Sequence, residues 1–212
     1  MKARNVIDKE MCESKYRFGA LEGEKNKSFY NGVILRELFS KYNLNYTVKD
    51  IESIVDTVMP DDIFHSTRES KINLTLLTQK LIRFQVYMKH QIAANAMILN
   101  GGVVTIIHNI TVDYSFIQKN GDEIKIYKVK NKKNTTMKRS GQSIFTRISK
   151  SMELYLLQLA GQQLYPNAYV TPCIIFLSHP KDKDTKLEDV SKFNNPLTSN
   201  VVSYHFSPSE EV

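Results

Sequence analysis

Asp113 and Lys128 are the residues whose types and spacing could do chemistry, because a β-hairpin turn between them would bring them together. Residues 110–118 and 123–130 have the composition of two strands, and Asn120-Gly121 between them is a strong signal for a two-residue turn. With that turn, Asp113 faces Lys128 across the hairpin. The plain alternative is an ordinary cross-strand ion pair, which contributes roughly 0.2–1 kcal/mol.

Position 126 lies diagonal to Asp113 on the same predicted face, where an acid would complete a cluster of two carboxylates and a lysine. Such a cluster holds Mg²⁺ or Mn²⁺ and stabilises the charge that develops when a phosphodiester is attacked by water. The sequence has Ile126 instead. Glu123 also precedes a lysine by two residues, but the expected register puts it opposite Gln118, about 17 Å along the strand from Asp113. Only a different turn or a slipped register would bring Glu123 close to Asp113.

A basic segment surrounds these residues and carries the whole net charge of +7. Between positions 124 and 152 there is no Asp or Glu, and the rest of the chain holds 20 basic and 22 acidic residues. A concentrated basic segment on a near-neutral body predicts a polyanionic partner, most simply nucleic acid. The plain alternative is a solvated lysine-rich loop. The residues expected to contact RNA are Lys130, Lys132, Lys133, Lys138, Arg139 and Arg147.

The elements that must position these residues follow from the spacing of apolar side chains. The predicted helices cover residues 27–42, 48–58, 72–99 and 143–164, the third as one helix or two joined ones that end at Gly101-Gly102. The predicted strands cover residues 103–108, 110–118, 123–130, 170–177 and 201–206.

This order predicts an α/β fold, with a small mixed β-sheet flanked by helices. We expect one domain over residues 1–206, with a helical N-terminal lobe up to about residue 100, a sheet-and-helix core after it, and a frayed tail at 207–212. No apolar run approaches the roughly 20 residues that span a bilayer, so a soluble intracellular protein is expected. Cys12 and Cys173 are far apart and are expected to be reduced thiols, with Cys173 in the core.

Two groups of motifs resemble the N-terminal cap-snatching endonuclease domain of the large polymerase protein of bunyavirus- and arenavirus-type segmented negative-strand RNA viruses. That domain is a PD-(D/E)xK nuclease. Ile110-Thr111-Val112-Asp113 stands where the family has Thr-Pro-Asp, and Tyr127-Lys128-Val129 resembles the family's closing strand. Leu35-Arg36-Glu37-Leu38-Phe39 and the later Asp50 resemble its N-terminal helix and following acid. The resemblance covers about residues 28–63 and 108–177.

The resemblance implies a PD-(D/E)xK-like fold, and a divalent Mn²⁺ or Mg²⁺ ion used to cleave capped host RNA into transcription primers. It assigns catalysis to Asp113 and Lys128, and metal binding to Asp113, Asp50 and, more loosely, Glu37. Asn31 stands where many members have a metal-binding histidine, and Ile126 where they have the second acid. With these two departures, metal binding and catalysis are expected to be weak or lost.

The resemblance also implies the partners: single-stranded capped mRNA and the remainder of a viral polymerase, in the host cytoplasm or within the virion. The isolated domain is expected to be monomeric and away from membranes. Two alternatives stay open. One is a non-catalytic module that binds RNA or the polymerase through the basic segment. The other is a relative of RecB-like DNA nucleases, whose Gln-x-x-x-Tyr motif is replaced here by Glu153-Leu-Tyr-Leu-Leu157.

Overall fold

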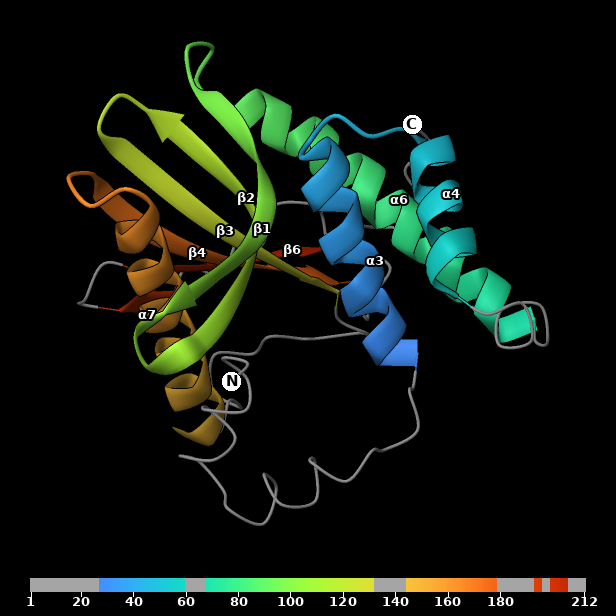
Figure 1. Ribbon diagram of the computed structural model, residues 1–212. Helices are drawn as coiled ribbons and strands as arrows, with labels where there is room; N and C mark the ends of the chain where they lie inside the picture. The colour runs from blue at the N-terminus through green and yellow to red at the C-terminus, as the bar shows by residue number, and fades with distance from the viewer. Residues whose placement is uncertain (1–26, 60–67, 132–143, 179–192, 196–198, 206–212) are drawn as a thin grey trace.

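The computed structural model describes residues 27–59, 68–131, 144–178, 193–195 and 199–205 (Figure 1). The first two helices have the bounds expected from the sequence: α3 is Lys27–Tyr42 and α4 is Val48–Val58. A capping box starts α4, because the Thr47 side chain accepts a hydrogen bond from the Asp50 backbone and the Asp50 carboxylate accepts one from the Thr47 backbone. The apolar stripe of α4 is buried: Ile51, Ile54 and Val55.

The third helix ends earlier than expected. Helix α6 covers Arg68–Gln91, and strand β1, Met97–Ile106, follows it. The prediction that Gly101-Gly102 ends a helix is therefore wrong, and the boundary expected near residue 100 falls inside a strand. Gly101 is needed for a different reason. A Cβ on it would lie 2.2 Å from the carbonyl oxygen of Ser115 on the neighbouring strand, so only glycine permits this close approach.

The sheet has six strands in the order β1-β2-β3-β4-β6-β5. Strands β1, β2 and β3 are antiparallel neighbours, whereas β4 is parallel to both β3 and β6. A short 3-10 turn, η1 (Ile107–Asn109), joins β1 to β2, and helix α7 (Ile144–Leu164) lies between β3 and β4 in the chain. The other strands are β2 Ile110–Asn120, β3 Glu123–Asn131, β4 Tyr169–Ser178, β5 Phe193–Asn195 and β6 Ser199–His205.

The two faces of the sheet are covered by different helices, as Figure 1 shows. Helices α3, α4 and α6 share one core with a face of the sheet, where Phe39, Phe84 and Phe116 are in contact and Cys173 is buried as expected. Helix α7 covers the opposite face in a second core, which is mostly aliphatic. The expected fold class, an α/β protein with a mixed sheet flanked by helices, is confirmed. The expected domain limits of 1–206 reach outside the described residues and stay a prediction.

Candidate active site at the fork of two strands

The register of the β2–β3 hairpin differs from the expected one by two residues. Asn120 pairs with Glu123, so the turn consists of Gly121 and Asp122 and not of Asn120-Gly121. Gly121 has a φ of 60°, which suits the first turn position of a type II′ turn, whereas the sequence-based prediction placed Asn120 and Gly121 as the two turn residues. Glu123 consequently lies beside the turn and does not face Gln118.

Strands β2 and β3 part beyond the pair Phe116 and Tyr127, where their ladder ends. Strand β3 continues alongside β4, and the first half of β2 continues alongside β1. At the point of parting, the backbone N–H of Val129 donates to the hydroxyl of Ser115 at 2.9 Å, which satisfies a buried donor that the ladder no longer reaches. We call residues 113–115 and 128–130, which border this opening, the β2–β3 fork.

Two ion pairs meet at the β2–β3 fork. The Lys128 ammonium is paired with the Asp113 carboxylate and also donates to the Asp113 backbone carbonyl at 3.2 Å. The Lys130 ammonium is paired with the carboxylate of Glu153, on α7, at 2.5 Å. The expected contact between Asp113 and Lys128 therefore forms, although the two strands pair two residues away from the expected register and their ladder ends before it reaches these residues.

The side chains of the two pairs are shielded to different degrees. Lys128 is 16% exposed and its partner Asp113 is 45% exposed, whereas Lys130 is 35% exposed and Glu153 is 19% exposed. The most accessible groups of the fork are therefore one carboxylate, that of Asp113, and one ammonium, that of Lys130. The site as a whole is electrically balanced, with two carboxylates and two ammonium groups.

The pKa of the Asp113 carboxyl is lowered from its usual value. Burial alone would raise this pKa, but the charge and hydrogen bond of Lys128, with the charge of Lys130, outweigh burial. A carboxyl whose pKa is lower in the folded state stabilises the fold above its unfolded pKa of about 3.9, and this contribution is lost as the pH falls through the folded pKa.

Asp113→Asn is therefore expected to be less stable than the wild type at neutral pH, with a difference that shrinks as the pH falls below about 4. Urea denaturation of both proteins over this pH range measures the effect. Asp56→Asn, at an exposed position of α4, is the matched control and should show little difference at any pH. A pH-independent deficit in Asp113→Asn would mean that lost packing and not lost charge is responsible.

Ile126 does not lie at the fork. It pairs with Ile117 within the closed part of the ladder, is fully buried, and packs in the core under α7. A Cβ on Gly161 of α7 would lie 3.4 Å from a methyl group of Ile126, so the helix closely covers this position. The interpretation of position 126 as a vacant metal-ligand position is therefore corrected: its side chain is part of the core.

The other positions that the resemblance connects with metal binding belong to the N-terminal helices α3 and α4. Asp50 is held in the capping box of α4, Glu37 is paired with its neighbour Arg36, and Asn31 is half-buried in α3. Across the described residues, no group of three or more His, Cys, Asp or Glu side chains is arranged to hold a metal ion. The described residues thus provide no such group of ligands around Asp113, and binding of Mn²⁺ or Mg²⁺ stays a prediction.

The expected RNA-binding residues fall largely outside the described part of the chain. Lys130 is at the fork, and the backbone of Arg147 is in α7, but the Arg147 side chain is not described. The remaining members of the set lie outside the described residues: Lys132, Lys133, Lys138 and Arg139.

Glu153 of α7, which pairs with Lys130 of the fork, is not among the site residues predicted from the sequence. It is the only Asp or Glu between residues 124 and 178, and it lies on the helix that follows the hairpin. An isolated acid in a long basic and apolar stretch was the available signal, but its pairing with Lys130 depends on how α7 packs against the sheet.

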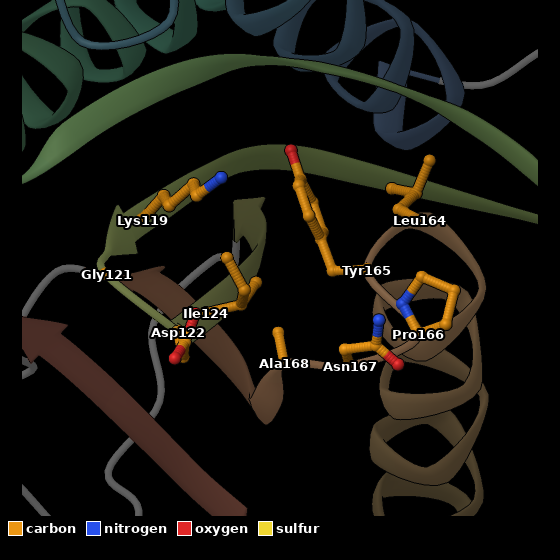
Figure 2. Close-up of a pocket in the computed structure, with 9 residues that line it drawn as sticks. All are labelled: Lys119, Gly121, Asp122, Ile124, Leu164, Tyr165, Pro166, Asn167 and Ala168. Atoms are coloured by element: carbon orange, nitrogen blue, oxygen red, sulfur yellow. The ribbon is translucent and has the colours of Figure 1, made fainter.

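A separate hollow of about 250 Å³ lies beside the β2–β3 turn and the connection from α7 to β4 (Figure 2). The Tyr165 ring stands in it with the side chain of Lys119 extended toward the ring, the ammonium 5.4 Å from the ring centroid. Lys119 and Asp122 are the only charged residues among those that line it. This hollow shares no residue with the fork. The ammonium group of Lys119, the one ammonium among its lining residues, is already engaged in the cation–π contact.

Comparison with known proteins assigns no family to this chain. No protein-family model matches it, and no curated protein matches it. A solved structure, a half-complex from a tetradecameric assembly of Thermococcus gammatolerans McrB AAA+ hexamers with bound McrC, is similar with 12% identity and a TM-score of 0.37. The match covers 85% of this chain and 46% of that one. In the described part of the chain, no helix is both long enough and apolar enough to cross a membrane.

Proposed function

We propose that this chain is an RNA-binding, endonuclease-like domain of a viral RNA polymerase, in which metal-dependent cleavage is weak or lost. The observation that carries the RNA-binding part is the position of Lys128 and Lys130, next to each other on one strand face at an opening between β2 and β3. The viral polymerase context comes from the motif resemblance alone. The confirmed α/β fold class is compatible with that resemblance.

The fork supports phosphate binding because it places two lysine ammonium groups close together at an opening of the sheet. Ammonium groups bind phosphate oxygens through charge-assisted hydrogen bonds, and an ordered ammonium loses less side-chain entropy on binding. The basic segment that follows β3 adds an electrostatic attraction to the RNA phosphates, and this attraction does not depend on the RNA sequence. Lys130 is the lysine that a phosphate can reach, and the more buried Lys128 adds positive charge beside it.

Lys128→Gln combined with Lys130→Gln is expected to weaken binding of single-stranded RNA. It should also reduce the slope of log Kd against log salt by about 0.7, the contribution of one phosphate neutralised on a single strand, because Lys130 is accessible and Lys128 is largely shielded. Fluorescence anisotropy of a labelled RNA at several salt concentrations measures both quantities. The matched control is Lys49→Gln combined with Lys89→Gln, which removes two exposed charges from α4 and α6.

An equal loss in both double variants would mean that only net charge matters and that the fork is not a binding site. Tighter binding to duplex DNA ends than to single-stranded RNA would favour the DNA nuclease alternative. Catalysis is tested in the same preparations with Mn²⁺. A higher melting temperature together with RNA cleavage that Asp113→Ala abolishes would show that the domain is an active metal-dependent nuclease.

A further inference from the structure

Glu153 places a negative charge where the sequence otherwise accumulates positive charge. Nine basic residues occur between positions 124 and 152, and Glu153 is the first acid after them. Its carboxylate does not point into solvent, since only 19% of the side chain is exposed and it is paired with the Lys130 ammonium. The more exposed lysine of the fork is thus occupied by a carboxylate supplied from α7.

We infer that Glu153 restrains RNA binding by competing with a backbone phosphate for Lys130. This inference rests on the proposed function. A phosphate that reaches Lys130 must either displace the Glu153 carboxylate or share the ammonium with it, and sharing places two anions close together. Lys130 without this partner would offer all of its donors to a phosphate.

Asp113 is a weaker candidate for such competition with RNA. Its partner Lys128 is only 16% exposed, so freeing that ammonium leaves it largely shielded from RNA. Lys130 is 35% exposed, so removing the charge of Glu153 frees an ammonium that a phosphate can reach. Glu153 is therefore the carboxylate whose removal should have the larger effect on binding.

A purely structural ion pair makes the opposite prediction. If Glu153 only anchors α7 to β3, neutralising it costs stability and leaves RNA affinity unchanged or lower. If it competes with RNA, neutralising it tightens binding, and the gain depends on Lys130 being present. A double-mutant cycle with Lys130 separates these two roles.

The experiment measures RNA anisotropy for the wild type, Glu153→Gln, Lys130→Gln and the double variant over a range of salt. Glu153→Gln is expected to lower Kd severalfold and to steepen the salt slope by about 0.7, one further phosphate contact on a single strand. In the Lys130→Gln background the same substitution should change little. Glu123→Gln, an exposed acid beside the hairpin turn, controls for the change in net charge and should have a smaller effect.

Unchanged or weaker RNA binding by folded Glu153→Gln would overturn the inference, as would an equal gain in the Lys130→Gln background. If neither the wild type nor Glu153→Gln binds RNA, the proposed function fails; if the wild type binds and only the gain is missing, the competition alone fails. Melting temperatures verify folding, and Glu153→Ser, which leaves room for water around Lys130, serves the same test if Glu153→Gln does not fold.

Discussion

Ile126→Glu is expected to unfold the domain at neutral pH and not to create a metal site. The residue is fully buried, pairs with Ile117 and is covered by α7 at Gly161. Replacing a core isoleucine forfeits about 2–5 kcal/mol of packing, and burying a carboxyl raises its pKa by up to about 3–5 units at about 1.4 kcal/mol each. Together these costs approach the whole stability of a typical domain, about 5–15 kcal/mol.

The stability of Ile126→Glu is expected to fall as the pH rises. An acid whose pKa is raised in the folded state loses stability as the pH rises above its unfolded pKa of about 4.3, so this variant should be most stable at acidic pH. Circular dichroism and urea denaturation across the acidic to neutral range measure it. Ile126→Val, which keeps the core apolar, should cost only about 0.5–1.5 kcal/mol.

One outcome would contradict this prediction. If Ile126→Glu folds like the wild type at neutral pH and its melting temperature rises with Mn²⁺, position 126 opens on the site and is not covered by α7. Ile126→Gln tests the cost of the polar side chain without the charge. Its stability should vary with pH no more than that of the wild type.

Gly101→Ala is expected to destabilise the fold by about 3 kcal/mol, because the added methyl group meets backbone and not side chain. Its Cβ would lie 2.2 Å from the carbonyl oxygen of Ser115, and β1 and β2 cannot separate locally without losing ladder hydrogen bonds. Ser115 also accepts the N–H of Val129 at the fork, so the disturbance should reach the candidate site. Denaturant unfolding measures the change in stability.

Gly102→Ala is the matched control on the neighbouring residue. Its Cβ would lie 3.0 Å from the hydroxyl at the end of the Tyr114 side chain, which can move, so the cost should be smaller. Gly32→Ala, in the interior of α3 with nothing within 4 Å, should instead stabilise the helix by about 0.5–1 kcal/mol. Similar losses at Gly101 and Gly102 would mean that the sheet relaxes around the added methyl group.

Local signals were sufficient for most elements of the fold. The periodicity of apolar residues placed α3 and α4 at their observed bounds, and strand composition located β2, β3 and β4 to within a few residues. The same signals overextended α6, because Ile92 and Met97 continue its apolar spacing although the helix ends at Gln91. The spacing of apolar residues carries no information about pairing with a distant strand. In the structure, β1 pairs with β2 from Met97 onward, and the helix ends before it.

The sequence by itself determined that Lys128 and Lys130 continue the face of β3 that begins with Ile124 and Ile126, because side chains alternate along a strand. Only the tertiary structure decided the rest of the site. The positive φ of Gly121 set the register, the packing of α7 buried Ile126, and the same helix brought Glu153 to Lys130. Face alternation depends on adjacent residues, whereas register and helix docking depend on contacts between segments far apart in the chain.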